Sequence, residues 1–135
     1  MPTSKVVYQS GLRTAAIHLQ SGKEIITDAP TDNQGKGEAF SPTDLLATSL
    51  ASCMLTIMGI KARDTEISIE GCSAEVTKTM AANPRRVSEI KISMDMTNGQ
   101  SFSTKDKKLL EGAAKTCPVA FSIHPEIKVN LTFSW

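Results

Sequence analysis

The stretch that most constrains the fold is SPTDLLATSLASCMLTIMGIKA, residues 41–62. Its first residues are typical of a helix start, because Ser41 can cap the helix, Pro42 fits the first helical position and Asp44 completes an S-x-x-D capping box. Apolar side chains then recur at helical spacing over a broad surface. They are Leu45, Leu46, Leu50, Met54, Ile57 and Met58. Because small residues fill most remaining angles, the sequence predicts a helix from Pro42 to about Ala62, buried within a domain or at a dimer interface.

The segments on either side of this helix alternate between strand and turn patterns. Before it, residues 5–9 and 12–19 read as strand around a Ser-Gly pair, and a turn at 20–23 leads to a strand over 24–27. After it, we expect these elements in order: strands near 67–78 and 87–96 joined by a turn at 81–84, a helix over 105–116, a short helix over 118–123 and a strand over 127–135. This order predicts a single α+β domain, residues 1–135, with mainly antiparallel sheet.

The composition argues against several classes of partner. Fifteen basic and fourteen acidic residues give a net charge of +1, and aromatic residues make up 4% of the chain. With no basic cluster and few stacking platforms, we expect no nucleic-acid partner. We also expect no apolar stretch of the ~18–20 residues that span a bilayer, and therefore no membrane partner. The segment 1–5 has no signal-peptide character, so we expect a cytoplasmic location.

The three cysteines, at positions 53, 72 and 117, are the candidate reactive groups. Their odd number does not describe a disulfide framework, and no CxxC or close pair of histidines provides metal-ligand spacing. We therefore expect no metal site, and each cysteine is either a buried small residue or a reactive thiol. Cys72 has the strand parity of Ala74 and Val76, so we expect it in the core.

Cys53 and Cys117 differ in their local settings. Cys53 lies well inside the predicted helix, beyond the N-terminal dipole, and is an inert packed residue unless another segment brings a positive charge. Cys117 precedes Pro118, which ends one helix and suits the first position of the next. Cys117 would then lie at a cap, where unpaired N–H groups lower the thiol pKa. The alternative is a helix break that merely contains a cysteine.

Arg13 is a candidate partner for a thiolate. It shares the strand parity of Ile17 and Leu19, and an arginine on an apolar face must find an anion or reach solvent. A guanidinium is always charged and presents several donors, so it could stabilise both a thiolate and a peroxide oxygen. The alternative is a surface arginine near the sheet edge.

The two cysteine motifs together resemble those of a known family. They are SPTDLL at 41–46 with ASC at 51–53, and CPV at 117–119. In order and approximate spacing this pair resembles the OsmC/Ohr family of osmotically inducible and organic hydroperoxide resistance proteins, on its OsmC-like branch. The similarity spans nearly the whole chain. It implies an OsmC-like fold, with mainly antiparallel sheets around long central helices, in an intertwined homodimer whose two active sites lie at the interface.

The resemblance also implies an activity and a set of site residues. The family is known for thiol-dependent peroxidases that reduce organic hydroperoxides in oxidative stress defence, and hydrogen peroxide is a further candidate substrate. By resemblance Cys53 would be the peroxidatic cysteine, Cys117 the resolving cysteine, and Arg13 the arginine that activates the peroxidatic thiolate. The disulfide formed in each turnover would be reduced by an external dithiol, with no bound cofactor.

One position departs from the family pattern. The peroxidases carry a glutamate two residues after the position of Ser41, where it pairs with the arginine, and here that position is Thr43. Asp44 or Glu38 could take its place as the partner of Arg13. The departure motivates an alternative function, that of an OsmC-like stress-associated binding protein with weak or no peroxidase activity.

Overall fold

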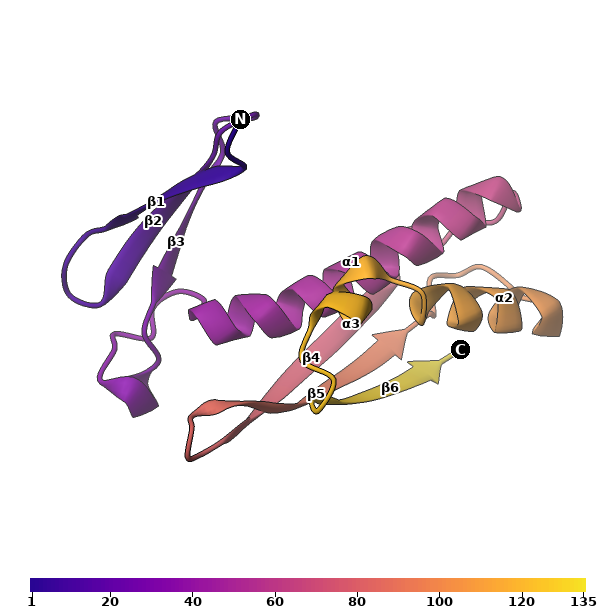
Figure 1. Ribbon diagram of the computed structural model, residues 1–135. Coiled ribbons are helices and arrows are strands. Elements are labelled where there is room, and N and C mark those ends of the chain that lie inside the picture. Colours follow the sequence, from indigo (N-terminus) through magenta and orange to yellow (C-terminus); the bar gives the residue numbers. More distant parts are fainter. The chain divides into compact units, whose positions relative to one another are not determined.

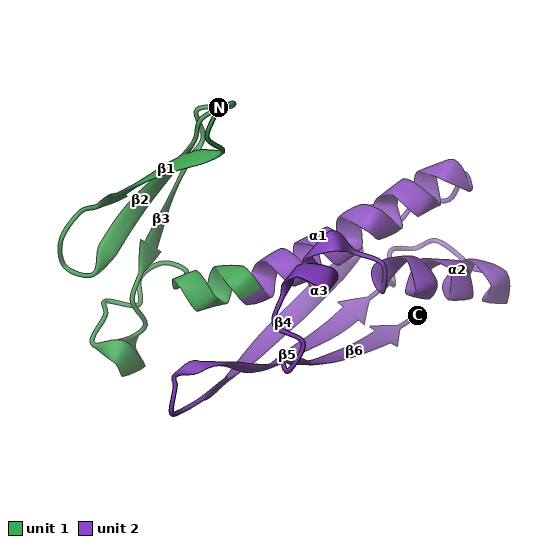
Figure 2. Ribbon diagram, viewed as in Figure 1, with its two compact units in different colours: residues 1–46 green, residues 47–135 purple.

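The computed structural model describes all residues from 1 to 135 and divides them into two compact units, residues 1–46 and 47–135 (Figure 2). The boundary between them falls inside α1 (Pro42–Asp64). Each unit contains a three-stranded sheet, which confirms the α+β class. The expectation of a single domain over residues 1–135 stays a prediction.

The sheet of the first unit is antiparallel throughout. It consists of β1 (Ser4–Tyr8), β2 (Arg13–His18) and β3 (Glu24–Asp28), in that order. The turn between β2 and β3 is closed by the Gly22 amide, which donates to the His18 carbonyl at 2.7 Å, with Gly22 at a φ of 75°. Glycine adopts this left-handed conformation at little steric cost. The register of this hairpin places Arg13 directly opposite Asp28.

The second unit packs three helices on one face of a sheet (Figure 1). The strands are β4 (Ser73–Ala81), β5 (Arg86–Asp95) and β6 (Lys128–Ser134), in that order. The helices are α1, α2 (Thr104–Ala114) and α3 (Pro118–Ser122). β5 pairs antiparallel with β4 and parallel with β6. The chain returns through α2 and α3 before it enters β6, as a parallel pair requires.

The hydrophobic core of the second unit joins α1, α2 and β5. Its members are almost fully buried, and the largest are Leu50, Met54, Met58, Ile90, Ile92, Met94, Met96 and Leu110. The alternation predicted for the strand over 87–96 is therefore confirmed, because residues 90, 92, 94 and 96 face the helices. The alternation in the last strand is also found, with half-buried Leu131 and Phe133 against the core.

Truncation of a core residue in β5 is expected to destabilise the protein strongly. Ile92 is 0% exposed, so Ile92→Ala leaves a cavity and should lower the free energy of unfolding by about 2–5 kcal/mol. Urea denaturation followed by circular dichroism measures the loss. Lys91→Ala is the matched control, because Lys91 lies next to Ile92 on the exposed face and should change stability by less than about 1 kcal/mol. Equal losses in the two variants would contradict this assignment of the core.

Two expectations from the sequence are wrong. The strand expected from Ile67 begins instead at Ser73, because the Ile67 amide closes the end of α1 by donating to the Ala62 carbonyl at 2.9 Å. Glu66 and Gly71 then adopt positive φ values of 60° and 86°, so residues 65–72 form turns rather than strand. The apolar residues of this segment still pack on the core, but from a turn.

The second wrong expectation concerns apolar segments. α1 is long and apolar enough to cross a membrane, judged by length and composition alone. A helix that forms the centre of a protein core meets the same criteria. Leu50, Met54 and Met58 of α1 are almost fully buried in such a core. The apolar character of α1 therefore reflects its place in the core of the second unit.

Candidate functional site

The position of Cys53 is set by the start of α1. The Asp44 amide donates to Ser41 Oγ at 3.0 Å, and the Ser41 amide donates to Asp44 Oδ2 at 2.9 Å. This reciprocal pair is the capping box expected from the sequence. Cys53 lies in the middle of the helix, half-buried, and packs against the core.

Cys117 is the N-cap residue of α3, as the Cys-Pro pair predicts. Its backbone is extended, with φ −69° and ψ 139°, and Pro118 occupies the first turn. The Ala120 amide donates to Cys117 Sγ at 3.3 Å. The sulfur therefore accepts the hydrogen bond that a side-chain oxygen usually accepts at an N-cap. Cys117 is 0% exposed.

The structure brings Cys53 and Cys117 together. Both are free thiols, and Cys53 lies close enough to Cys117 to raise the pKa of its thiol through hydrogen bonding and charge. The residues are far apart in the sequence, so the contact depends on α1 and the start of α3 packing side by side. On oxidation two neighbouring thiols can lose their hydrogens and form a disulfide. This is the arrangement that a peroxidatic and a resolving cysteine need.

One expectation for Cys117 is wrong. The helix start was expected to lower its pKa, and the Ala120 amide does act in that direction. Burial has the larger effect, however, and raises the pKa of the Cys117 thiol above its ordinary value. The hydrogen bond with Cys53 and the negative charge that a Cys53 thiolate would carry raise the pKa of Cys117 further. Cys117 therefore keeps its proton at neutral pH.

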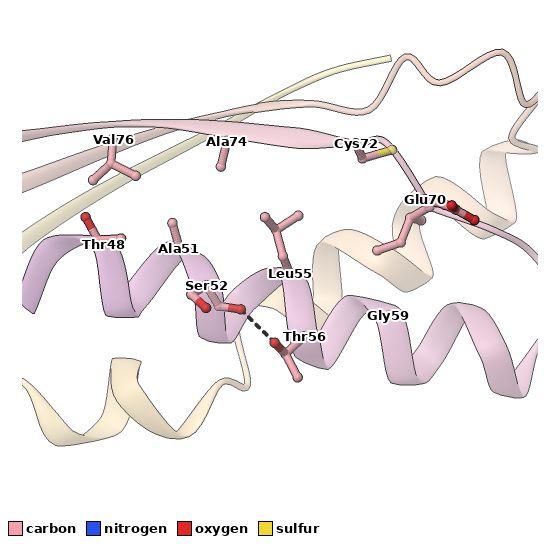
Figure 3. A pocket seen from close by; sticks show the side chains of 11 residues that line it. Thr48, Ala51, Ser52, Leu55, Thr56, Gly59, Glu70, Cys72, Ala74 and Val76 are labelled. Atoms are coloured by element: carbon pink, nitrogen blue, oxygen red, sulfur yellow. Dashed lines mark hydrogen bonds between the residues drawn. The ribbon is translucent and has the colours of Figure 1, made fainter. Parts of the chain in front are cut away.

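Cys72 lies apart from this pair. It immediately precedes β4 and lines a cavity of about 520 Å³ between α1 and β4, which Figure 3 shows with Leu55 pointing from the helix toward the strand. Burial raises the pKa of the Cys72 thiol, and the carboxylate of Asp95 adds to the shift. The expectation that Cys72 packs in the core is met only in part, because its side chain is half-buried at the core edge.

Arg13 forms a bidentate ion pair at the start of β2. Its Nε and Nη2 atoms donate to the two carboxylate oxygens of Asp28 at 2.7 and 2.8 Å. Asp28 is 0% exposed and also accepts the Glu38 amide at 3.1 Å. The Glu38 carboxylate lies 3.7 Å from Arg13 Nη2 and remains largely exposed. These contacts use Nε and Nη2, and Nη1 takes part in none of them.

Asp44 and Glu38 were the two candidate partners of Arg13. Glu38 does contact Arg13, whereas Asp44 forms the capping box of α1. Sequence reasoning missed Asp28, which lies one residue beyond the strand expected over 24–27 and is the last residue of β3. The turn expected at 20–23 would place residue 30 opposite Arg13, whereas the observed hairpin turns at residues 19–22 and places Asp28 there.

The Arg13–Asp28 pair should make stability depend on pH. Arg13 holds the pKa of Asp28 below its ordinary value, chiefly through the hydrogen-bonded ion pair. A carboxyl group whose pKa is lowered by folding stabilises the protein above the pKa of the unfolded state and loses this effect as pH falls through the folded pKa. Asp28→Asn should therefore lower the melting temperature by several degrees at pH 7, and the gap to wild type should close below about pH 4.

Thermal denaturation between pH 3 and 8 tests this expectation. Glu24→Gln is the matched control, since Glu24 lies on the same strand, carries the same charge and is exposed. A melting temperature of Asp28→Asn that matches wild type at pH 7, or a gap that widens in acid, would contradict the proposed linkage.

The two groups of residues lie in different units. Arg13, Asp28 and Glu38 belong to residues 1–46, and Cys53 and Cys117 belong to residues 47–135. No three His, Cys, Asp or Glu side chains gather closely enough to hold a metal ion. The chemistry that the second unit offers is that of two neighbouring thiols, half-buried Cys53 and buried Cys117, which can pass between dithiol and disulfide states.

A pair of neighbouring thiols on an α+β fold is typical of proteins that use thiol redox chemistry. Comparison with known proteins identifies the family to which this chain belongs. The family model for OsmC-like proteins matches residues 35–132, well over half of the chain. The protein therefore belongs to the OsmC-like family, a family associated with stress and hydroperoxide resistance. No match was found among the curated proteins.

Solved structures support the same assignment. A candidate osmotic stress induced and detoxification response protein from Psychrobacter arcticus is 66% identical, with a TM-score of 0.94 over 99% of this chain and 96% of that one. An OsmC-like protein from Mycoplasma pneumoniae is 22% identical, with a TM-score of 0.78 over 97% and 94%. An organic hydroperoxide resistance protein OsmC from Legionella pneumophila is 19% identical, with a TM-score of 0.76 over 100% and 98%. The last two show a shared fold.

Proposed function

We propose that this protein is a thiol peroxidase that reduces organic hydroperoxides through Cys53 and Cys117. The observation that carries the proposal is the position of these two thiols next to one another in the second unit. Membership of a family that includes hydroperoxide resistance proteins supports the choice of substrate class. Hydrogen peroxide is a further candidate substrate, and the physiological role would be defence against oxidative stress.

The proposed reaction has three steps: reduction of the peroxide, formation of a disulfide, and reduction of that disulfide. The Cys53 thiolate attacks the distal oxygen of the hydroperoxide, the O–O bond breaks, and the alkoxide takes a proton and leaves as an alcohol. Cys53 is now a sulfenic acid. The Cys117 sulfur attacks the Cys53 sulfur, the S–O bond breaks, and the hydroxyl leaves with the Cys117 proton as water. An external dithiol then reduces the disulfide by exchange and is itself oxidised.

The two cysteines are assigned their roles by burial. Cys117 is 0% exposed and its pKa is raised, so it is a poor first nucleophile and a thiol that holds its proton until needed. Cys53 is half-buried, so a peroxide can reach it. Because the two thiols are neighbours in the fold, the second step joins groups that are already held close together.

Arg13 is the proposed cation for the Cys53 thiolate and the peroxide oxygens. The ion pair with Asp28 fixes the plane of its guanidinium and leaves the Nη1 donors outside that pair. In this proposal Asp28, with Glu38, takes the place of the family glutamate that Thr43 replaces. Arg13→Lys keeps the charge but not the fork of donors, and should lower kcat/KM about tenfold. Peroxidase kinetics measure the loss, and unchanged kinetics would remove Arg13 from the site.

The proposed active form is an intertwined homodimer. The sheet of the first unit exposes several large apolar side chains, among them Val6 at 61%, Tyr8 at 63% and Ile25 at 53%. The hydrophobic core cluster lies entirely in residues 47–135. An antiparallel sheet with exposed apolar residues and no core cluster of its own favours association. Light scattering coupled to size-exclusion chromatography tests this, and a monomeric mass would contradict it.

Two measurements test this function: the turnover of peroxide, and the mass of the protein after it has been oxidised. The purified protein should reduce cumene hydroperoxide with dithiothreitol or a dihydrolipoyl compound as electron donor. Mass spectrometry of the intact protein after one equivalent of peroxide should show the loss of two hydrogens, with peptide mapping to a Cys53–Cys117 bond. Untouched thiols and no turnover would instead favour the alternative, a stress-associated binding protein, to which the threonine at position 43 points.

A further inference from the structure

The two neighbouring thiols differ in their access to solvent. Cys117 is 0% exposed and belongs to the hydrophobic core of the second unit, whereas Cys53 is half-buried. Val119 and Ala120, which follow Cys117 in α3, pack against the same core. A disulfide offers two sulfurs to an incoming thiolate, and access is one of the factors that decide which sulfur is attacked. Of the two, only the Cys53 sulfur lies in a side chain that solvent reaches.

The start of α3 is built to hold negative charge on the Cys117 sulfur. The Ala120 amide donates to Cys117 Sγ at 3.3 Å, and the amides of Ala120 and Val119 both act to lower the pKa of Cys117. Negative charge forms on this sulfur when Cys117 leaves a disulfide with the electron pair of the broken bond. The two amides therefore favour Cys117 as the leaving group when the disulfide is reduced.

Burial opposes this departure. It is the largest influence on the pKa of Cys117, and it raises that pKa. A thiol with a higher pKa leaves a disulfide more slowly, but the effect is graded. Access is closer to all or none, because a fully buried sulfur is attacked only after the packing around it opens. Access therefore outweighs the slower departure, and the attack is expected at Cys53.

We propose that the electron donor attacks the Cys53 sulfur of the oxidised protein and that Cys117 leaves, so that the mixed disulfide forms on Cys53. This inference rests on the proposed peroxidase function for its place in the catalytic cycle, and it names the reacting sulfur of the last step. Cys53 then meets both reactants, the peroxide and the donor, by the same approach from solvent. Cys117 meets neither reactant and exchanges bonds with Cys53 alone.

The electron donor is a dithiol with one thiol ionised. Its thiolate bonds to Cys53 Sγ, the bond between Cys53 and Cys117 breaks, and Cys117 Sγ leaves with the electron pair. The second donor thiol gives its proton to Cys117 and attacks the first donor sulfur. Cys53 leaves as a thiolate, and the donor, having lost two electrons, becomes a cyclic disulfide. The cycle thus ends with Cys53 ionised and Cys117 protonated, which is the state that attacks the next peroxide.

Trapping of the mixed disulfide tests the inference. The Cys72→Ser protein is oxidised with diamide and treated briefly with 2-mercaptoethanol. Acid then stops the exchange, and N-ethylmaleimide blocks free thiols in denaturant. Peptide mapping should find mercaptoethanol on Cys53 and maleimide on Cys117. The reverse pattern, or equal amounts of both, would overturn the inference. The same exchange in guanidinium is the control, and it should place mercaptoethanol on both cysteines.

A second measurement applies even if Cys117 displaces the mercaptoethanol too quickly to trap. Cys72→Ser/Cys117→Ser and Cys72→Ser/Cys53→Ser each keep one sulfur of the pair, which is joined to 2-nitro-5-thiobenzoate. Dithiothreitol should release the coloured thiolate from Cys53 at least about a hundredfold faster than from Cys117. In guanidinium the two rates should agree within about threefold, because access no longer differs. Equal rates in the folded proteins would contradict the assignment.

Neither measurement depends on peroxide, so the two proposals fail separately. If peroxide turnover is absent but exchange is selective for Cys53, the peroxidase proposal fails and the assignment of the attacked sulfur stands. If turnover is found but exchange is unselective or favours Cys117, this inference is overturned and the peroxidase proposal stands.

Discussion

Cys53→Ser is expected to lower kcat for cumene hydroperoxide by at least about a thousandfold. A serine hydroxyl at this position is not appreciably ionised and cannot take up the peroxide oxygen, so the first chemical step is lost. The loss should be equal for alkyl hydroperoxides of every kind, because the attacked O–O bond is the same. The assay is steady-state consumption of peroxide with dithiothreitol as reductant.

Cys72→Ser is the matched control for this loss. Cys72 has a pKa raised by burial and lines a different cavity, between α1 and β4. Leu55, which lines that cavity, lies on nearly the opposite side of α1 from Cys53. The control should keep at least about half of the wild-type rate. A Cys53→Ser protein that turns over at the wild-type rate would end the proposed mechanism.

The second large effect is expected from Cys117→Ser. Without a resolving thiol the first turnover still occurs, and one oxygen atom should be added to the protein as the Cys53 sulfenic acid. No disulfide can follow, so turnover that depends on a dihydrolipoyl donor should fall by about a hundredfold or more. Stopped-flow measurement of the first turnover should give a rate within about tenfold of wild type.

Mass spectrometry separates the two cysteines by their products. Wild type should lose two hydrogens on oxidation, Cys117→Ser should gain one oxygen, and Cys53→Ser should remain unchanged at the same dose of peroxide. Trapping of the sulfenic acid with dimedone should label Cys117→Ser alone. An oxygen added to Cys53→Ser at residue 117 would reverse the assigned roles.

Local sequence patterns predict the secondary structure well. The S-x-x-D box at Ser41 forms as expected, and the Cys-Pro pair does start a helix with Cys117 at its cap. These signals are strong because each backbone group at a helix end must find a partner nearby in sequence. The prediction of a strand from Ile67 was wrong because it rested on the alternation of apolar residues alone. These residues serve the core from a turn, and alternation alone does not distinguish the two.

The properties of the site depend on contacts that local patterns do not carry. The pKa of Cys117 was expected to fall because the sequence reveals the cap, but it does not reveal the depth of burial that outweighs the cap. Asp28 was missed for a different reason. Its role follows from the hairpin register, which differs by two residues from the one that a turn at 20–23 would give, and from burial, which the sequence does not reveal. The contact between Cys53 and Cys117 was expected only through the family resemblance.

The cap of α3 has a consequence for how oxidation would be sensed within the protein. The sulfur that would enter the disulfide is the same atom that receives the Ala120 amide. When Cys117 is part of a disulfide, its sulfur points toward the Cys53 sulfur and carries less negative charge. It is then a weaker hydrogen-bond acceptor for the Ala120 amide. The amide proton of Ala120 should therefore exchange with solvent faster in the oxidised protein. Hydrogen exchange in the first turn of α3 would then report whether the thiol pair is reduced or oxidised.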